Sequence, residues 1–394
     1  MSWPMVKLKD CCEVVGGATP KRNVAFYWDG DIPWITPKDV SNLSEPYIYE
    51  APEYISKAGY KSAATYMLPV GTVLLTSRAP IGNVAIAGIE LCTNQGFKSL
   101  IPGQNVHSKY LYHCIKKFVP QLELLGNGAT FKEVSKRVVE DFEIPLPPLE
   151  EQKRIAAILD KADGVRQKRE QAIKLADDFL RATFLEMFGD PVGNPKGWKK
   201  NKIKKGVLDI TSGWSAIGGN IPCKSNEFGV LKISSVTSGI FKPEENKVVD
   251  CKIIPASKKL IRPKKGDLLF SRANTRELVA AICMVHQDYD NLFLPDKLWS
   301  IKLNHELLLP EFFLILIQNE KVRELLTKQA TGTSGSMLNI SKNKFEETEI
   351  IFPEINVQKD FCNAFRKTMN LKAKLIKSNE LANESFNSLS QKVF

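Results

Sequence analysis

The side chains that can do covalent or metal chemistry are few in this chain, and their spacing does not favour it. Eight cysteines are spread from Cys11 to Cys362 without a Cys-x-x-Cys pair, and only four histidines are present. Such spacing is typical of reduced thiols and argues against both a disulfide framework and a zinc site. We therefore expect the cysteines to be buried as small apolar side chains.

The motifs of common enzymes are also absent from the sequence. There is no Gly-x-x-x-x-Gly-Lys-Ser/Thr loop for ATP, no His-Glu-x-x-His metal helix and no Gly-x-Ser-x-Gly elbow. The Asn/Asp-Pro-Pro-aromatic loop with which an amino-methyltransferase grips a flipped base is missing as well. We therefore predict a protein that binds and organises, with no catalytic residue and no metal of its own.

The net charge points to a partner. The 394 residues include 55 Lys+Arg and 44 Asp+Glu, a net charge of +11. Residues 1–148 carry 15 basic and 14 acidic side chains, residues 149–189 carry 8 of each, residues 190–352 carry 25 and 18, and residues 353–394 carry 7 and 4. A basic surplus favours a polyanionic partner, nucleic acid first and an acidic membrane surface second.

The sequence predicts neither a membrane span nor an export signal. No apolar run approaches the roughly 18 residues that a membrane helix needs. The N-terminus lacks the charged-then-apolar pattern of a secretory signal. We therefore expect a cytoplasmic protein that does not contact membrane.

A tandem repeat supplies the elements that must position the binding side chains. Residues 135–153 and 341–359 align without a gap, share eight of 19 positions and lie 206 residues apart. At that offset Phe188 coincides with Phe394, so the two copies end together. Upstream, residues 77–79 and 271–273 both read Ser-Arg-Ala after an apolar run. The chain is thus two copies of one two-part unit.

Each copy begins with short apolar runs between turn residues and ends with a long helical pattern. The first parts, residues 1–147 and 190–353, predict mixed α/β domains of short strands with one or two helices. The second parts, residues 148–189 and 354–394, predict helices, the first of them about 55 Å long at 1.5 Å per residue. Apolar or small residues on both helices follow a heptad seam, formed by Ile155, Ile158, Ala162, Val165, Ala172, Ala176 and Phe179 and by Phe361, Ala364, Leu371 and Leu375.

Stripes of this length have to be buried, and each copy supplies one. We expect the two helices to pack antiparallel, with the alternative that each packs only on its own domain. Antiparallel pairing would relate the domains by a pseudo-twofold axis and hold them at a fixed spacing, as two half-sites on one duplex require. The predicted fold class is α+β, or mixed α/β, with two similar domains separated by two long antiparallel coiled-coil helices.

The segment that joins the first domain to its helix resembles a known family. Phe142-Glu-Ile-Pro-Leu-Pro-Pro-Leu-Glu-Glu-Gln-Lys-Arg-Ile-Ala-Ala-Ile-Leu159 is similar to the region that ends the first target-recognition domain of type I restriction–modification specificity subunits. The second copy, Ile350-Ile-Phe-Pro-Glu-Ile-Asn-Val-Gln358, keeps one proline and the glutamine. The Gly16-Gly17-Ala18-Thr19-Pro20 turn and the stretch from Trp34 to Asp39 also resemble the family's first domain.

The resemblance implies a division of labour. Residues 1–147 and 190–353 would be target-recognition domains that each read half of a split, asymmetric DNA sequence, and residues 148–189 and 354–394 would be spacer helices that fix the gap. The partners would be two methyltransferase subunits, which carry S-adenosylmethionine, and restriction subunits, which use ATP and magnesium. This chain would hold no cofactor. Two alternatives stay open: the recognition subunit of a methylation-only or fused methylase–nuclease system, and a coiled-coil scaffold that binds protein instead of DNA.

Candidate DNA contacts follow from the chemistry of base edges and phosphates. Arg and Lys suit guanine, Asn and Gln suit adenine, Ser and Thr are more permissive, and Lys and Arg bind phosphates. In the first domain the candidates are Thr19, Lys21, Arg22, Thr36, Lys38, Arg78, Asn83, Lys98 and Thr130. In the second they are Trp214, Lys232, Ser235, Arg272, Asn274, Arg276, Lys297, Thr333 and Ser336.

Some candidates have a competing structural explanation. Arg78 and Arg272 form the best pair, because both follow an apolar strand at matching places in the repeat, but surface ion pairing would explain them equally well. The lysines between residues 196 and 205 would either track phosphates or lie in a solvated linker. Trp34, Trp214 and Trp299 are expected in the core rather than as stacking platforms for bases.

Overall fold

The computed structural model describes residues 3–41, 43, 45–78, 80–127, 132–332 and 337–394. The chain folds as two compact units: unit 1 comprises Met1–Ala172 with Leu375–Phe394, and unit 2 comprises Ile173–Lys374. Each long helix begins in one unit and ends in the other, so that α6 (Leu149–Phe188) starts in unit 1 and α11 (Ile355–Val393) starts in unit 2. Within the described ranges, no helix combines the length and the apolarity that a membrane crossing requires.

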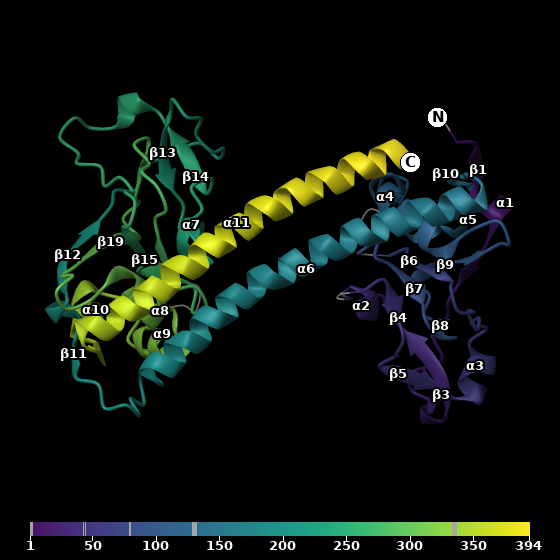
Figure 1. Cartoon of the computed structure of the whole chain (residues 1–394), viewed down its shortest axis with the longest axis horizontal. Coiled ribbons are helices and arrows are strands. Elements are labelled where there is room, and N and C mark those ends of the chain that lie inside the picture. The colour runs from purple at the N-terminus through teal and green to yellow at the C-terminus, as the bar shows by residue number, and fades with distance from the viewer. Residues whose placement is uncertain (1–2, 42, 44, 79, 128–131, 333–336) are drawn as a thin grey trace. The chain divides into compact units, whose positions relative to one another are not determined.

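Unit 1 is built on short strands (Figure 1). Its five-stranded sheet has the order β2 (Cys12–Gly16), β9 (Phe97–Pro102), β6 (Val73–Thr76), β7 (Val84–Ala87) and β4 (Tyr47–Ile48). A three-stranded sheet has the order β5 (Glu53–Ile55), β3 (Trp28–Ile35) and β8 (Cys92–Thr93), and β1 (Met5–Lys7) pairs with β10 (Glu143–Pro145). The helices are α1 (Leu8–Cys11), α2 (Pro37–Val40), α3 (Lys57–Ser62), α4 (Ser108–Leu124) and α5 (Lys136–Asp141).

Unit 2 repeats this plan. Its four-stranded sheet has the order β12 (Val207–Ser212), β19 (Leu298–Leu303), β15 (Leu268–Ser271) and β17 (Ile282–Met284). The other strands form β14 (Asn246–Val249), β13 (Phe228–Leu231) and β18 (Leu292–Phe293), and the pairs β11 (Lys200–Lys202) with β21 (Glu349–Ile351) and β16 (Ala273–Asn274) with β20 (Leu338–Asn339). The helices are α7 (Ser234–Thr237), α8 (Pro310–Gln318), α9 (Glu320–Lys328) and α10 (Lys342–Glu347). The matching strand orders confirm the predicted mixed fold with two similar domains.

A glutamine fixes the start of α6 to the rest of unit 1. Gln152 is fully buried. Its Oε1 accepts a hydrogen bond from the N–H of His107 at 2.9 Å, and its Nε2 donates to the carbonyls of Asn105 and Pro147 at 2.9 and 2.8 Å. One side chain thus satisfies three backbone groups that would otherwise be buried without a partner.

Gln358 does the same at the start of α11 in unit 2. It is also fully buried. It accepts from the N–H of Leu309 at 2.9 Å and donates to the carbonyls of Leu307 and Pro353 at 2.9 and 2.8 Å. Both glutamines were visible in the sequence as identities of the repeat, but the pattern did not reveal that role.

An ion pair of opposite polarity follows each glutamine anchor. In unit 1, Lys109 of α4 lies 2.6 Å from Asp160 of α6, and His113 lies 2.7 Å from the same carboxylate. In unit 2, Glu311 of α8 lies 2.7 Å from Arg366 of α11. Burial alone would raise the pKa of Asp160, but hydrogen bonds from His113 and Lys109 outweigh it and hold that pKa below its ordinary value. The acidic residue of the pair therefore lies on the long helix α6 in unit 1 and on the domain helix α8 in unit 2.

The cores show that the long helices run antiparallel. In unit 1 the cluster around α4 contains the first turns of α6 and the last turns of α11, through Ile155, Ala156, Leu159, Phe386, Leu389, Val393 and Phe394. In unit 2 the cluster around α8 contains the last turns of α6 and the first turns of α11, through Leu180, Phe184, Phe188, Phe361, Cys362 and Phe365. Each unit thus joins the start of one helix to the end of the other, as predicted.

The predicted heptad seam is wrong at several positions. Ile155, Ala176 and Phe361 are buried, and Ala162, Ala172, Ala364 and Leu375 are half-buried. Four members are exposed by 37 to 56%, namely Ile158, Val165, Phe179 and Leu371. The physical reason is that the domain, more than the partner helix, buries each helix end. The buried stripe is therefore shifted by about one residue from the predicted seam, with Leu159 and Leu180 buried in place of Ile158 and Phe179.

Polar contacts join the long helices where the domains do not cover them. In unit 1, Arg169 donates to the carbonyl of Ser378 at 2.7 Å. In unit 2, the Nζ of Lys372 lies 2.5 Å from the carboxylate of Asp177. A continuous apolar coiled-coil seam is therefore not what holds these segments together.

Candidate nucleic-acid interface

The loop after the first sheet strand is fixed in the same way in both units. A Cβ on Gly17 would lie 2.2 Å from the carbonyl oxygen of Thr93, and one on Gly213 would lie 1.9 Å from that of Leu294. The N–H that follows each glycine donates to the same carbonyl, at 2.9 and 2.8 Å. Only glycine allows so close an approach of two backbone segments.

Two polar side-chain pairs lie at the matching point of these loops. Thr19, two residues after the first glycine, hydrogen-bonds Gln95, and Ser215, two residues after the second, hydrogen-bonds Asp296. Of these four, the sequence reasoning found only Thr19. The others could have been found from the glycine turn, because it aligns the two loops.

Three charged side chains of unit 1 form a cluster beside β6. The carboxylate of Glu133 lies 2.9 Å from the Nε of Arg78 and 3.3 Å from the Nζ of Lys98. Lys98 is largely buried, while Arg78 keeps about half of its side chain exposed. Ion pairing thus engages Arg78, and a contact with another anion would have to compete with Glu133.

Replacing Glu133 by glutamine should make unit 1 less sensitive to acid. Burial raises the pKa of Glu133, but hydrogen bonds from Arg78 and Lys98 outweigh it, so that pKa lies below its ordinary value of 4.5. The carboxylate therefore stabilises the fold above pH 4.5, and this stability is lost as the pH falls through the lowered value. Wild-type protein should lose more stability between pH 5 and pH 3 than the variant, by under about 1 kcal/mol for so exposed a group.

Urea unfolding at the two pH values measures this difference. Glu123→Gln, which removes an exposed carboxylate from α4 of the same unit, is the control. An equal response of both variants to acid would contradict the role assigned to Glu133.

Arg272 is not the counterpart of Arg78, which corrects the pairing expected from the sequence. The N–H of Val134 donates to the carbonyl of Ser77 at 2.9 Å, and the N–H of Ile340 donates to that of Arg272 at 2.8 Å. Val134 and Ile340 directly precede the matched N-cap serines of the repeat. Arg272 therefore matches Ser77, one residue earlier on the strand, and the two arginines leave opposite faces of it.

Arg272 nevertheless reaches an equivalent acceptor. Its Nη1 donates to the Oδ1 of Asn339 at 2.9 Å, and its Nε donates to the carbonyl of Asp296 at 2.9 Å. Asn339 occupies the place that Glu133 has in unit 1, since each lies two residues before the N-cap serine of its copy. Arg272 is thus more firmly held than Arg78 and has a quarter of its side chain exposed.

The remaining candidates of unit 1 differ in their availability. Arg22 pairs with Glu53 at 2.8 Å and lies 4.0 Å from the ring centroid of Trp28. Thr36 caps α2 in a capping box with Asp39 and is therefore already engaged. Lys21 and Lys38 are exposed, Asn83 donates to Ser41 at 3.0 Å, and Thr130 lies outside the described residues.

The remaining candidates of unit 2 include one clear error. Ser235 is fully buried and donates to the carbonyl of Lys232 at 2.7 Å, so it cannot reach DNA. No local pattern around Ser235 indicates that this small polar residue closes a turn inside the core. Lys232 pairs with Glu245 at 3.6 Å. Asn274 and Lys297 are half-buried, Arg276 is exposed, and Thr333 and Ser336 lie outside the described residues.

The tryptophans lie mostly as expected. Trp34 and Trp299 are buried in the cores. Trp214 is half-buried and stacks on Phe293, with ring centroids 6.0 Å apart. The indole of Trp214 is thus part of a small cluster and keeps one part exposed.

The lysine run of residues 196–205 mainly fixes the beginning of unit 2. Lys196 donates to carbonyls in the last turn of α6, and Lys200 donates to the carbonyl of Val192 at 2.9 Å. Lys202 and Lys204 both lie 2.5 Å from Glu347 and lower the pKa of that carboxyl to about 2. These lysines are neither a solvated linker nor a free track for phosphates.

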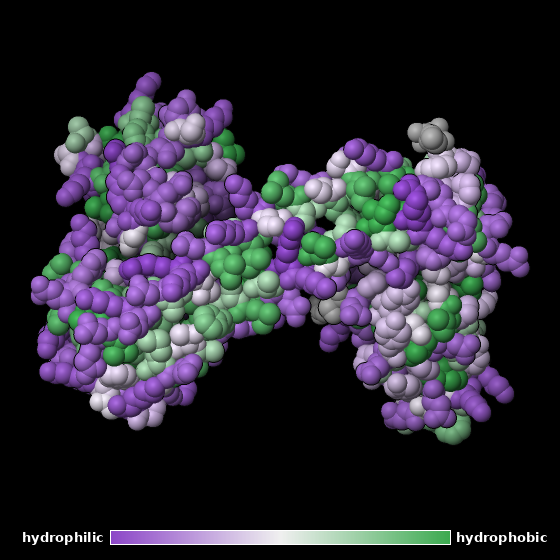
Figure 2. Space-filling view, in the orientation of Figure 1, coloured by the Kyte–Doolittle hydropathy of each residue, from purple (hydrophilic) through white to green (hydrophobic). Residues whose placement is uncertain are grey.

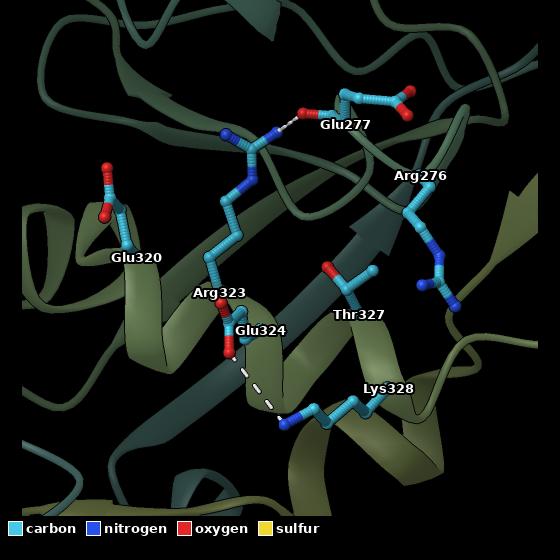
Figure 3. Close-up of a pocket in the computed structure, with 7 residues that line it drawn as sticks. All are labelled: Arg276, Glu277, Glu320, Arg323, Glu324, Thr327 and Lys328. Atoms are coloured by element: carbon cyan, nitrogen blue, oxygen red, sulfur yellow. Dashed lines mark hydrogen bonds and ion pairs between the residues drawn. The ribbon is translucent and has the colours of Figure 1, made fainter.

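A shallow groove beside α9 is lined by equal numbers of basic and acidic side chains (Figure 3). Arg323 donates to the carbonyls of Glu277 and Val279, the latter at 3.2 Å, and burial lowers the pKa of this guanidinium. Lys328 lies 3.8 Å from Glu324. The balanced charge makes the groove a poor anion site, although Arg276 borders it. Among the described residues there is also no cluster of three side chains suited to hold a metal ion.

A protein-family comparison matches the first part of the chain. The model of the type I restriction modification DNA specificity domain matches residues 2–175, which include the first domain and the start of α6. Residues 2–175 are thus similar to the DNA specificity domain of type I restriction–modification systems. This confirms the resemblance that residues 142–159 indicated.

Relatives in the specificity-subunit family match the chain to different extents. The specificity subunit of the type I restriction enzyme MjaIX of Methanocaldococcus jannaschii is 34% identical over 255 residues, which are 60% of this chain and 59% of that relative. The EcoKI specificity subunit of Escherichia coli K12 is 24% identical over 381 residues, 90% of this chain and 80% of the relative. The match to the first of these thus spans less than two thirds of its length.

A solved structure shares the fold. The crystal structure of the S subunit of a type I restriction-modification system from M. genitalium covers 100% of this chain and 96% of its own, with a TM-score of 0.60 at 12% identity. At 12% sequence identity, this structural similarity supports a shared fold only. The individual DNA-contact residues remain predictions from chemistry and position.

Proposed function

We propose that this chain is the DNA-specificity subunit of a type I restriction–modification complex, in which each domain reads one half of a split DNA target. The observation that carries the proposal is the detailed repeat: two domains of matching strand order, each joined to a long helix by the same buried glutamine anchor. The family match of residues 2–175 supports a DNA role for the first copy. The repeat extends that role to the second.

The matched loops offer different chemistry, as unlike half-sites require. At equivalent places unit 1 has Thr19 with Gln95, and unit 2 has Ser215 with Asp296. Glutamine suits adenine, whereas a carboxylate accepts from the amino group of cytosine. Two domains of one fold would in this way recognise different bases with the same loop.

Exchanging one domain tests the proposal. Residues 195–352 are replaced by those of a relative, the chain is expressed with its methyltransferase subunits, and methylated adenines are mapped by sequencing. We expect one half of the recognised sequence to change and the other to stay. A change in both halves, or in neither, would overturn the assignment of one domain to each half-site.

We further propose that the chain acts without a catalytic site or cofactor of its own. The methyltransferase subunits would bring S-adenosylmethionine, and restriction subunits would bring ATP and magnesium. An apolar surface on α6 in unit 2 supports a docking role, because Leu175, Phe179 and Leu185 are exposed by 57, 55 and 48% on the side opposite the buried stripe. Figure 2 shows hydrophobic surface over this part of α6.

The double variant Leu175→Ser/Phe179→Ser should lose the methyltransferase subunits while its thermal stability hardly changes. Both side chains are exposed in the isolated chain, so their loss opens no cavity, whereas central apolar residues of an interface carry much of its affinity. We expect the affinity to fall at least about tenfold. Isothermal titration with purified methyltransferase subunit measures it, and Leu208→Ser, at an exposed leucine of β12, is the matched control.

A further inference from the structure

The second domain carries two exposed isoleucines on an uncharged loop. Residues 213–222, between β12 and β13, contain no Asp, Glu, Lys or Arg. Ile217 is 88% exposed and Ile221 is 67% exposed. Two large aliphatic side chains so close in the sequence and so far from the core indicate a contact surface.

The exposure belongs to a fixed loop. The N–H of Gly219 donates to the carbonyl of Val248 in β14 at 2.9 Å, and the N–H of Val248 donates to the carbonyl of Ile221 at 2.9 Å. A Cβ on Gly218 would lie 2.8 Å from the same carbonyl oxygen of Val248. At the other end, Trp214 is held by its stack on Phe293. The loop backbone is therefore bonded along the sheet, and the isoleucines project from it.

The segment next to the loop is strongly basic. Residues 246–262 carry five basic side chains against the single acid Asp250, whose carboxylate caps the backbone of Lys252 at 2.9 Å. The Nζ of Lys258 lies 5.9 Å from the ring centroid of Trp214, and a Cβ on Gly218 would lie 3.0 Å from that of Lys247. Figure 2 shows the surface over β13 and β14 as largely hydrophilic with separate hydrophobic residues.

Unit 1 lacks this combination. Its corresponding loop, between β2 and β3, exposes Phe26 by 76%. The nearby Arg22 is paired with Glu53, and β3 carries the exposed carboxylates Asp29 and Asp31. Part of the basic surplus in the second half of the chain therefore lies in residues 246–262, beside the isoleucine loop.

We propose that Ile217 and Ile221 form an apolar wedge that enters duplex DNA at the half-site of the second domain, while lysines of residues 246–262 bind the flanking phosphates. The proposal rests on the proposed function and adds how one domain grips its half-site. Apolar side chains flanked by basic ones can part a base step and bend the duplex. An anionic membrane is the other surface that would accept such a patch, but binding to it usually uses a longer amphipathic helix.

The test uses the chain in complex with its methyltransferase subunits and a duplex that contains the target found by adenine mapping. The double variant Ile217→Ser/Ile221→Ser should bind at least tenfold more weakly with an unchanged slope of log K against log salt. 2-Aminopurine placed along the half-site of the second domain should brighten on binding of wild type and not of the variant. Lys258→Ala/Lys259→Ala should instead lower the salt slope by about 2, since each phosphate contact contributes about 0.9.

The control is Ile240→Ser, which removes an isoleucine that is 58% exposed elsewhere in unit 2 and should bind like wild type. Suppose that wild type binds the target duplex in preference to a duplex without the target, and that the isoleucine variant has the same affinity and the same fluorescence change as wild type. The wedge is then wrong, and the proposed function stands. If wild type itself fails to discriminate the target, the proposed function fails. Sedimentation of wild type, but not of the variant, with phosphatidylglycerol vesicles, together with unchanged DNA binding, would replace the wedge by a membrane contact.

Discussion

Replacing Gln152 by leucine should destabilise unit 1 by about 3–5 kcal/mol, because three buried backbone groups lose their partner at once. The N–H of His107 and the carbonyls of Asn105 and Pro147 bond to this one fully buried side chain. Leucine has a similar volume, so the effect measures lost hydrogen bonds rather than a cavity. Each orphaned group costs about 1–3 kcal/mol, and the sum is reduced where the chain relaxes.

Chemical unfolding followed by hydrogen exchange locates this loss. Gln152→Leu should reduce protection in α4 and the first turns of α6, and Gln358→Leu should do the same in α8 and the first turns of α11. Gln171→Leu, at an exposed position of α6, is the matched control and should change stability by under about 0.5 kcal/mol. A loss in Gln152→Leu no larger than in this control would show that the anchor is dispensable.

Replacing Phe188 by alanine should destabilise unit 2 by about 3–5 kcal/mol, the usual cost of truncating a buried phenylalanine. Phe188 is fully buried, and its ring lies 4.8 Å from that of Phe312, 5.0 Å from that of Phe184 and 5.6 Å from that of Phe361. This cluster joins the end of α6 to the start of α11. The truncation should therefore loosen both helices within unit 2.

The repeat provides the control. Phe394 occupies the equivalent place in unit 1, but it is only half-buried and packs on Tyr110 and Phe118 at 5.4 and 6.5 Å. Phe394→Ala should therefore cost less than half as much as Phe188→Ala. Thermal unfolding of the two variants gives the comparison, and equal losses would mean that burial does not set the cost at this position.

Much of the architecture could be predicted from the sequence, because its signals are long. The helix predicted within residues 148–189 spans Leu149–Phe188, because its helical pattern is many turns long. The antiparallel arrangement of the two long helices agrees with the prediction as well, although several residues of the expected seam are exposed. Short helices show the limit, since Asn319 caps a new helix and so separates α8 from α9. A side-chain cap of this kind is only a local signal.

The site was less predictable for a physical reason. Residues 77–79 and 271–273 read identically, yet hydrogen bonding matches Ser77 with Arg272. A shift by one residue on a strand turns a side chain to the other face. The apolar runs, which end at Leu75 and Phe270, match Ser77 with Arg272, but the identical Ser-Arg-Ala letters favour the wrong alignment. The exposure of Phe179 and the burial of Ser235 are errors of the same kind, because the partner that buries a residue is not encoded beside it.

The reversed ion pairs also bear on how the gene can recombine. The stretch shared by residues 135–153 and 341–359 is where the two halves are most alike, so an unequal crossover between them would fall there. One product would join the first domain to α11 and place Lys109 against Arg366. The reciprocal product would place Glu311 against Asp160. Like charges would then meet where the parent chain has contacts of 2.6 and 2.7 Å, so the polarity of one side-chain pair disfavours recombinants that would shorten or lengthen the repeat.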